Sequence, residues 1–322
     1  MLSWGIAATG IIAREVGRVI AAEPGMRVAA VGSRSADRAR GLAAELGAPR
    51  SYGSYTELVG DPEVDAVYVA VPQSHHLEVV EPAIAAGRAV LCEKPLTTTV
   101  ADAERMVKLA RDAGVFLMEG MWMRFNPLVR RLADLVASEE FGRPRSVSAS
   151  FGFALPYDAA AVHRLWDPAL GGGALLDLGI YPLALAQLLL GEPEGMTVTG
   201  GVGESGVDAE AALLLTYPGG ARALLETSLV SPMANTATVV GTAMRAELAA
   251  PFFAPQRLTV HGERAEEFTL DPGEDGYIGY VNELREVRDC LTAGRTESAV
   301  MPLADTLTVM RLLERARGAL GL

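Results

Sequence analysis

The chain has 322 residues, of which 50% are hydrophobic and 21% are charged, and its formal net charge at pH 7 is −12. This composition is that of a folded globular protein and excludes an intrinsically disordered chain. The acidic charge leaves no broad basic patch, so we expect neither nucleic acid nor an anionic membrane as a partner.

Local features exclude further classes of protein. No stretch approaches the roughly 18 consecutive apolar residues of a membrane span. The first residues lack the basic segment and cleavage site of a signal peptide. Cys92 and Cys290 lie far apart in the sequence and form no metal or redox motif. We therefore expect a cytoplasmic protein with reduced thiols and no bound metal.

Residues 1–121 alternate short apolar strands with amphipathic helices. Ser35 and Ser54 stand where a helix needs an N-terminal cap, and a further helix is expected over residues 100–113. Strand–helix alternation of this kind predicts an α/β Rossmann domain with a doubly wound parallel sheet. The expected strands are residues 2–6, 27–31, 50–52, 66–71, 89–92 and 115–118.

The first strand is followed by the sequence GIAATG, residues 5–10. It departs from the dinucleotide fingerprint G-x-G-x-x-G only in having alanine at the second glycine. Its last glycine leads into a helix whose N-terminus would receive the pyrophosphate of a dinucleotide. The residues expected to contact that cofactor are Gly5, Ala7, Thr9, Gly10, Ile11 and Ile12.

The second strand ends in VGSRS, where an NAD site usually has an acidic residue for the ribose hydroxyls. Ser33 and Arg34 occupy that position, and Arg38 follows one helical turn later. A guanidinium can pair bidentately with a 2′-phosphate and can stack on adenine. We expect NADP(H) to be preferred and leave NAD(H) open.

Two later strand ends carry further polar side chains. The fourth strand leads into VPQSHH, where Val71, Pro72 and Gln73 would face the middle of the cofactor, and the histidines begin the next helix. The fifth strand ends in Glu93-Lys94-Pro95, which puts a lysine where hydride transfer would occur. The proline ring restricts Lys94 to extended backbone, so the lysine is held in place.

From about residue 145 the sequence changes to alternating strands with a hairpin turn at Pro218-Gly219-Gly220. We expect residues 122–322 to form a second α+β domain with a large, mostly antiparallel sheet, and Gly318 to end the last helix. That helix, residues 302–317, can pack back on the first domain. The outer face of the sheet needs a cover, for which a second subunit is a candidate. Expected strands are residues 145–153, 197–202, 211–217, 221–230 and 236–240, and expected helices are residues 173–190, 280–292 and 302–317.

Four motifs together resemble the Gfo/Idh/MocA oxidoreductase family: GIAATG, SRS, EKP, and GGGALLDLGIY at residues 171–181. The resemblance spans nearly the whole chain. The EKP and GGG-x-x-x-D-x-G-x-Y forms look most like the branch that holds dimeric dihydrodiol dehydrogenase, bacterial xylose dehydrogenases and glucose-fructose oxidoreductase. Many other relatives carry histidine where this chain has Tyr181.

The resemblance implies an acid–base site. Lys94 and Tyr181 would flank the reacting carbon, with Asp177 helping to orient the substrate. A nearby ammonium favours the phenolate form of a tyrosine, so Tyr181 would take or return the hydroxyl proton. The glycines would let a helix start lie close to the nicotinamide and the substrate. Further positions implied by the resemblance are His76, Glu93 and Arg124 at the cofactor, and Trp122, Arg164 and Trp166 at the substrate.

The implied activity is that of an NAD(P)-dependent oxidoreductase acting on a secondary alcohol, or the matching carbonyl, of a sugar or a cyclic trans-diol. An NADPH-dependent nucleotide-sugar 3-ketoreductase remains open, and so does a non-catalytic NADP(H)-binding sensor. Within the family the implied assembly is a homodimer or homotetramer built through the second sheet.

Overall fold

The computed structural model describes residues 1–322, which divide into two compact units. The first unit comprises Met1–Met121 and Tyr280–Leu307, and the second comprises Trp122–Gly279 and Thr308–Leu322. Residues 280–307, which the sequence analysis assigns to the second domain, therefore belong to the first unit. Side-chain bonds tie them there: Arg285 contacts Glu23 at 2.7 Å, and the Thr306 hydroxyl donates to Glu119 at 3.0 Å.

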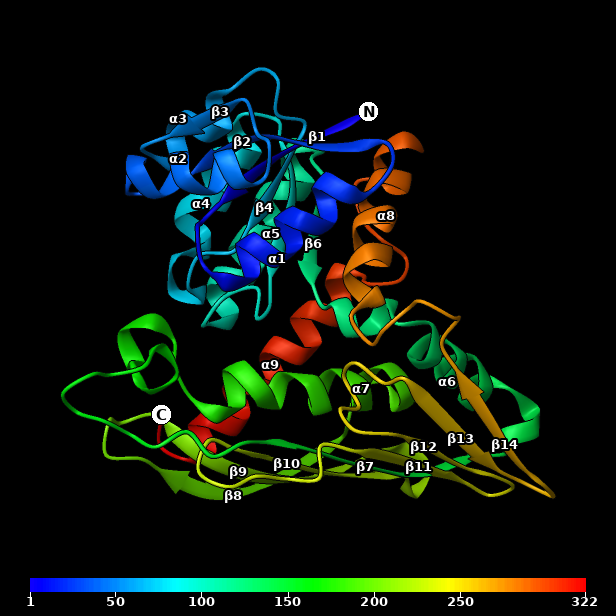
Figure 1. The fold of residues 1–322 in the computed structure, drawn as a ribbon. Coiled ribbons are helices and arrows are strands. Elements are labelled where there is room, and N and C mark those ends of the chain that lie inside the picture. Colours follow the sequence, from blue (N-terminus) through cyan, green and yellow to red (C-terminus); the bar gives the residue numbers. More distant parts are fainter. The chain divides into compact units, whose positions relative to one another are not determined.

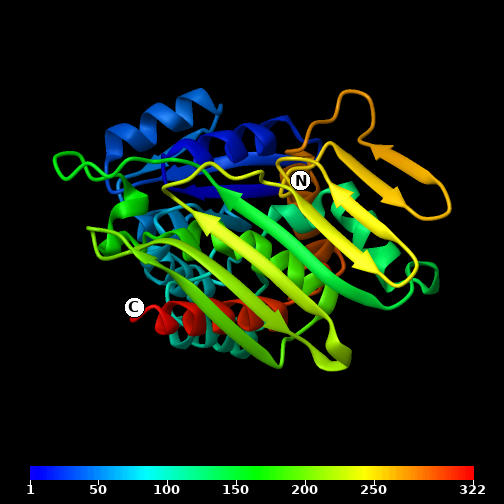
Figure 2. The ribbon, with the colours of Figure 1, turned by 90° about the horizontal axis from the view of Figure 1, so that it is seen from below.

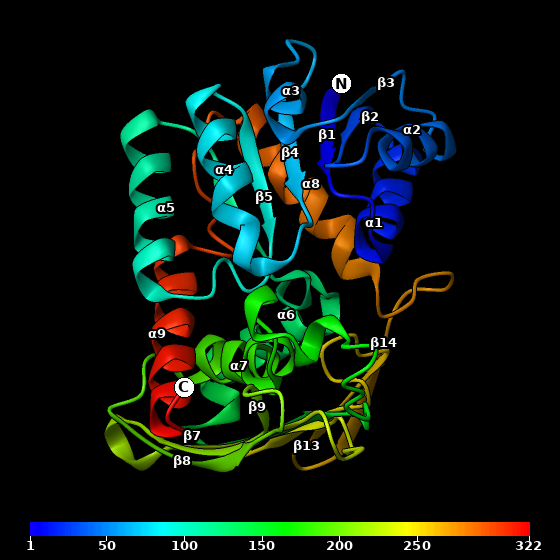
Figure 3. The ribbon, with the colours of Figure 1, turned by 90° about the vertical axis from the view of Figure 1, so that its left-hand side faces the viewer.

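The first unit is built on a six-stranded parallel sheet with the strand order β3-β2-β1-β4-β5-β6 (Figures 1 and 3). Strands β4 and β5 are buried along their whole length, as expected for a sheet covered on both faces. The order reverses between β1 and β4, and ligands of open α/β sheets bind at such a switch point. The strands are β1 (Leu2–Ala7), β2 (Met26–Gly32), β3 (Arg50–Tyr52), β4 (Ala66–Val69), β5 (Ala89–Glu93) and β6 (Leu117–Gly120).

The helices of the first unit begin where the sequence provides caps. The Ser35 hydroxyl oxygen accepts the Arg38 N–H, and the Ser54 hydroxyl oxygen accepts the Glu57 N–H, so both expected caps are confirmed. Figure 3 shows α4 and α5 side by side along the sheet. The helices are α1 (Ile11–Ala22), α2 (Ala36–Glu45), α3 (Tyr55–Gly60), α4 (His76–Ala85) and α5 (Val100–Ala113), with most of α8 (Ile278–Thr292) from later in the chain.

The second unit holds an eight-stranded sheet in the order β14-β13-β12-β11-β7-β10-β9-β8 (Figure 2). Only β7 and β10 pair in parallel, so the expected mostly antiparallel sheet is confirmed. The last three strands are not predicted from the sequence, because they are only four or five residues long and two of them, β12 and β14, carry two charged residues each. The strands are β7 (Pro144–Gly152), β8 (Gly195–Val202), β9 (Asp208–Thr216), β10 (Arg222–Ser228), β11 (Ala237–Gly241), β12 (Arg245–Leu248), β13 (Arg257–His261) and β14 (Ala265–Thr269).

Helices α6 (Pro127–Ala137) and α7 (Ile180–Leu190) lie on one face of this sheet, and Figure 1 shows its other face without helices. By length and composition, the helical stretch Pro168–Leu190 is apolar enough to cross a membrane, but 83% of its most apolar window is buried inside the protein. Such burial is that of a core helix.

The last helix, α9 (Leu303–Ala319), ends later than the sequence analysis expects. Gly318 lies inside the helix, so its expected role as the helix stop is wrong. The left-handed backbone comes at Gly321, which has a φ of 82°.

Candidate cofactor and catalytic site

The turn between β1 and α1 has the features of a phosphate-binding loop. A Cβ atom at Gly5 would lie 3.0 Å from the Val64 side chain, so this glycine lets β1 pack closely in the core. Gly10 is the N-cap residue of α1, and no side chain caps the helix there. A Cβ atom at Gly10 would have no neighbour within 4 Å. The first-turn N–H groups of α1 are therefore open to an anion such as a pyrophosphate.

Ala8, in the same turn, has a φ of 143°. A non-glycine residue with such a backbone costs on the order of 1–3 kcal/mol, and such strain concentrates at ligand-binding loops. Two features of the turn, the uncapped start of α1 and the strained backbone of Ala8, are therefore those of a dinucleotide-binding loop.

Two exposed arginines follow the end of β2. The buried Ser33 hydroxyl oxygen accepts the Ser35 N–H at 3.3 Å, so Ser33 shapes the turn. Arg34 and Arg38 are exposed, and both positive charges act on Tyr55. Burial raises the pKa of Tyr55, while the two guanidinium groups oppose that shift. The arginines and the tyrosine ring form a cationic, partly aromatic corner that suits a 2′-phosphate and an adenine.

His76 connects two loops at the carboxyl edge of the sheet. One ring nitrogen lies 3.0 Å from the carbonyl oxygen of Leu96, and the other lies 3.0 Å from that of Val71. Burial lowers the pKa of His76 to about 4, so at neutral pH the ring has one N–H and donates one of these bonds. Because both nitrogens face the protein's own backbone, His76 fixes the loop that carries Pro72 and Gln73.

The EKP motif ends β5 with its two charged side chains in different surroundings. The Glu93 carboxylate is buried and accepts the Tyr68 hydroxyl at 2.5 Å. Lys94 is half-buried. Glu93 and Lys94 are therefore not a surface ion pair, and any contact of Glu93 with the cofactor is expected from its backbone.

A buried carboxyl group, Glu283 of α8, interacts electrostatically with Glu93 of this motif. It is fully buried, and neither of its oxygens has a hydrogen-bond partner. Burial raises the pKa of Glu283 well above its ordinary value, and the charges of Glu93 and Glu119 raise it further. The protonated acid is therefore favoured at this position.

The glycine run of the second unit packs against the protein itself. A Cβ atom at Gly172 would lie 2.6 Å from the Leu165 carbonyl oxygen, and one at Gly173 would collide with the Asp208 carboxylate. The φ angles of Gly171 and Gly173 are 78° and 121°, which disfavour any other residue. The close approach that the three glycines permit is therefore, in this structure, that of the chain to its own neighbouring segments.

The glycines lead into a π-helical turn, Leu175–Gly179, that continues into α7. Single π-helical turns inside α-helices are frequent at functional sites. Asp177 lies in this turn, and the Arg164 guanidinium donates two hydrogen bonds to its carboxylate, of 3.0 and 3.4 Å. This bidentate pair fixes the direction of the Asp177 side chain.

Tyr181, at the start of α7, is surrounded by aromatic rings. The Trp122 indole N–H donates to the Tyr181 hydroxyl oxygen at 2.9 Å. The ring centroids of Phe253 and Phe151 lie 5.1 and 5.6 Å from that of Tyr181, and Tyr277 stacks on Trp122 at 5.5 Å. We call Trp122, Phe151, Phe253 and Tyr277 the aromatic cage.

The remaining expected residues of this unit lie in other surroundings. Arg124 is buried, and its guanidinium donates to the side chain of Gln187 in α7. Trp166 is buried in a separate hydrophobic cluster and donates to the Leu155 carbonyl oxygen at 3.0 Å. Tyr181 and Trp122 are thus hydrogen-bonded to each other, Asp177 and Arg164 form an ion pair, and Trp166 belongs to neither pair.

Sequence reasoning missed three members of the aromatic cage: Phe151, Phe253 and Tyr277. They come from a strand end and two loops that are distant in sequence, so no spacing rule connects them. For Phe151 and Phe253 the available signal was the presence of aromatic residues in the segments 151–166 and 252–256, whose course the sequence does not reveal. No sequence signal pointed to Tyr277.

An open, doubly wound sheet with a bare helix start at its switch point is the architecture of dinucleotide-binding enzymes. Residues 2–121 match the family model described as "Oxidoreductase family, NAD-binding Rossmann fold", and residues 129–266 match the "GFO/IDH/MocA C-terminal domain". The chain belongs to the Gfo/Idh/MocA oxidoreductase family.

Relatives align along the whole chain. It is 39% identical over 330 residues to trans-1,2-dihydrobenzene-1,2-diol dehydrogenase of Mus musculus, covering 99% of this chain and 97% of the relative. The enzyme of the same name from Oryctolagus cuniculus is 39% identical, with 98% of each chain covered.

Two solved structures share the fold. The aldose-aldose oxidoreductase of Caulobacter crescentus, complexed with glycerol, matches with a TM-score of 0.89 and 27% identity, covering 99% of this chain and 97% of that one. A 3-ketoreductase of Actinomadura kijaniata, in complex with NADP and TDP-benzene, matches with a TM-score of 0.86 and 29% identity, with the same coverage.

Proposed function

We propose that this protein is an NADP(H)-dependent oxidoreductase that interconverts a secondary alcohol and a carbonyl on a cyclic trans-diol or a sugar. The proposal rests on the position of the Tyr181 hydroxyl. It accepts a 2.9 Å hydrogen bond from the Trp122 indole N–H and is surrounded by the aromatic cage, in a chain that belongs to an oxidoreductase family. The test is NADPH formation by the purified protein with NADP⁺ and a panel of cyclic diols and aldoses.

Tyr181 is the proposed acid–base group. An indole N–H is a donor only, so the Tyr181 oxygen accepts from Trp122 and its own proton points elsewhere. In reduction the Tyr181 hydroxyl would give its proton to a carbonyl oxygen, and in oxidation the Trp122 N–H would stabilise the phenolate that receives a proton. NADP(H), when bound, supplies or accepts the hydride.

Lys94 is proposed to act on the same substrate as Tyr181. The two residues belong to different units, Lys94 to the first and Tyr181 to the second. The half-buried Lys94 side chain would polarise the substrate oxygen. Loss of turnover in Lys94→Met, with NADPH binding retained, is the expected result.

The cofactor preference is proposed from the corner formed by Arg34, Arg38 and Tyr55. Its two guanidinium groups would pair with a 2′-phosphate that NADPH has and NADH lacks. A fluorescence titration with each reduced cofactor tests this. We expect a lower dissociation constant for NADPH, and equal constants would contradict the assignment.

The substrate class is proposed from the cage and from Asp177. Aromatic rings offer flat apolar surfaces to the ring of a diol or to the C–H face of a sugar, and the fixed Asp177 carboxylate can accept a neighbouring hydroxyl proton. The relatives named trans-1,2-dihydrobenzene-1,2-diol dehydrogenase support a cyclic diol, and the aldose-aldose oxidoreductase supports a sugar. Comparing kcat/KM for the two classes decides between them.

The rival 3-ketoreductase function would need a basic groove for a nucleotide diphosphate. Of the arginines that could form one, Arg145 donates to the Gly219 carbonyl oxygen at 3.1 Å and so braces a hairpin. Apart from the likeness to the 3-ketoreductase of Actinomadura kijaniata, no observation on this chain favours the rival. A non-catalytic sensor would bind NADPH without turnover of any diol or sugar.

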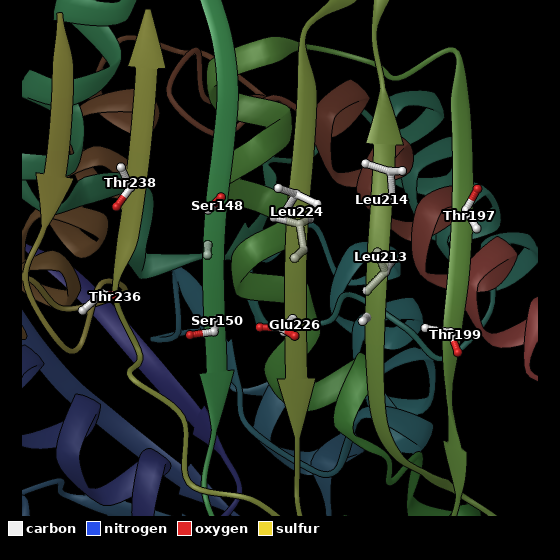
Figure 4. A pocket seen from close by; sticks show the side chains of 13 residues that line it. Ser148, Ser150, Thr197, Thr199, Leu213, Leu214, Leu224, Glu226, Thr236 and Thr238 are labelled. Atoms are coloured by element: carbon white, nitrogen blue, oxygen red, sulfur yellow. The ribbon is translucent and has the colours of Figure 1, made fainter.

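We also propose that the open face of the eight-stranded sheet pairs two subunits, in a homodimer or as part of a homotetramer. A groove of about 450 Å³ lies on this face (Figure 4). Leu214 and Leu224 remain 39% and 48% exposed there, with one carboxylate, Glu226, among them. Hydroxyl side chains form most of the rest: Ser148, Ser150, Thr197, Thr199, Thr236 and Thr238. Sedimentation over a range of concentrations tests for the oligomer.

We propose a cytoplasmic location and a small molecule as the substrate partner. The two cysteines are free and buried, which agrees with a reducing compartment. The net charge of −12 disfavours nucleic acid, and the burial of the apolar stretch Pro168–Leu190 favours a core role over membrane insertion. Fractionation of cells into cytosol and membranes is the direct test.

A further inference from the structure

Asp208, the first residue of β9, meets the glycine turn of the second unit from the side. It is fully buried, and its Oδ2 atom accepts the Leu175 backbone N–H at 2.5 Å. The backbone N–H groups of Ala174 and of Asp208 itself also favour its charged form. The carboxylate thus satisfies N–H groups at the start of the helical stretch, which otherwise lack intrahelical partners.

The glycine run is shaped around this carboxylate. A Cβ atom at Gly173 would overlap the Oδ1 atom of Asp208, and the φ of 121° at Gly173 excludes most other residues independently. From the next strand, the Thr227 hydroxyl donates to the Ala174 carbonyl oxygen at 3.3 Å. Strands β9 and β10 therefore hold the first residues of the helical stretch from two sides.

The helical stretch whose start Asp208 and Thr227 hold carries the proposed acid–base residues. Leu175 opens the π-helical turn, Asp177 follows two residues later, and Tyr181 is the second residue of α7. A negative charge at the N-terminus of a helix is also favourable, because the helix dipole is positive there. Burial raises the pKa of Asp208 to about 6, and the positive charge of Arg317 opposes that shift.

We propose that Asp208 is a positioning residue for the acid–base site: its carboxylate fixes the start of the helical stretch that places Asp177 and Tyr181. Asp208 acts through the Leu175 N–H and the glycine turn, and it does not touch substrate. The inference rests on the proposed function for its catalytic meaning. The structural linkage between Asp208 and Tyr181 can be tested without turnover.

The first measurement compares Asp208→Ala and Asp208→Asn with the wild type by steady-state kinetics. Asp208→Ala removes the acceptor, and we expect kcat to fall by roughly a hundredfold, as small displacements of a catalytic group can cause. The dissociation constant for NADPH should not change, because the proposed cofactor residues at the strand ends belong to the first unit. Asp208→Asn keeps an oxygen acceptor of the same reach, so its kcat should stay close to that of the wild type.

The second measurement needs no substrate. The chain has three tryptophans, so a ¹⁵N-labelled sample has three indole N–H signals, and Trp122→Phe identifies the one from Trp122. That N–H bonds to the Tyr181 hydroxyl, so its signal reports on the position of Tyr181. We expect it to move in Asp208→Ala and to stay in Asp208→Asn. Glu210→Gln, two residues further along β9 on its exposed side, is the matched charge control and should change neither kinetics nor spectrum.

If Asp208→Ala does not fold, Asp208→Ser replaces it, because the shorter hydroxyl cannot reach the Leu175 N–H. A folded Ala or Ser variant with wild-type kcat and an unmoved Trp122 signal would overturn the inference. So would an Asn variant as impaired as the Ala variant. If the wild type itself turns over no substrate, the proposed function fails, and the Trp122 signal still decides whether Asp208 positions the Tyr181 helix.

Discussion

Replacing Tyr181 by phenylalanine removes one oxygen and leaves the ring contacts in place. The ring centroids of Phe253, Phe151 and Trp122 lie 5.1, 5.6 and 6.1 Å from that of Tyr181, and a phenylalanine ring can keep all three contacts. We therefore expect KM for the substrate to change little. The loss should fall on kcat, because the proton carrier is gone.

The expected size follows from two separate effects. Loss of a general acid–base group lowers turnover by roughly 10²–10⁴-fold, or about 3–5 kcal/mol of transition-state stabilisation. The Trp122 N–H, which is buried, also loses its acceptor, and such an unsatisfied group costs about 1–3 kcal/mol of folding stability. Steady-state kinetics with NADP⁺ and urea unfolding measure these two quantities on one variant.

Tyr217→Phe is the matched control. Tyr217 is buried in the same unit, its hydroxyl has no hydrogen-bond partner, and burial raises its pKa. Removing that hydroxyl should leave kcat unchanged and should not lower stability. A Tyr181→Phe enzyme that keeps most of the wild-type kcat would refute the acid–base role.

Three further outcomes are expected. Arg34→Ala should weaken NADPH binding by roughly 10- to 100-fold and leave NADH binding unchanged, as a cofactor titration would show; equal effects on both would remove the 2′-phosphate assignment. Glu283→Gln should stabilise the protein above about pH 4.5. Because folding raises the pKa of Glu283, the free energy of unfolding of the wild type falls as pH increases from the unfolded pKa to the folded pKa, and the variant lacks this loss. Urea unfolding across pH should show a gain of up to about 1.4 kcal/mol per pH unit in that window, and no gain at low pH. Leu224→Asp should shift sedimentation toward the monomer, and an unchanged oligomer would show that the sheet face is not the interface.

Much of the first unit could be predicted from sequence because its signals are local. Buried strands such as β4 are continuous apolar runs, and Ser35 and Ser54 mark helix starts within a few residues of the bonds they make. The segment 280–307 could not be assigned in this way. Its membership of the first unit depends on long-range bonds, such as that from Arg285 to Glu23, that have no local pattern.

The second unit illustrates a different limit. The glycine run signalled a close backbone approach, but the sequence could not say that the approaching group is the Asp208 carboxylate, 35 positions after Gly173. The aromatic cage likewise assembles from segments far apart in the chain. Tyr181, Asp177, Trp122 and Arg164 could be selected by motif and family resemblance. The three rings Phe151, Phe253 and Tyr277, and the pairing of these residues with one another, required the structure.

Hydride transfer itself tests the proposed function, followed as NADPH formation when the purified protein is mixed with NADP⁺ and either a cyclic trans-diol or an aldose. We predict sustained turnover with at least one of these classes, lost in Tyr181→Phe and kept in Tyr217→Phe. Tight NADPH binding without turnover of either class would contradict it and would favour a cofactor-binding sensor.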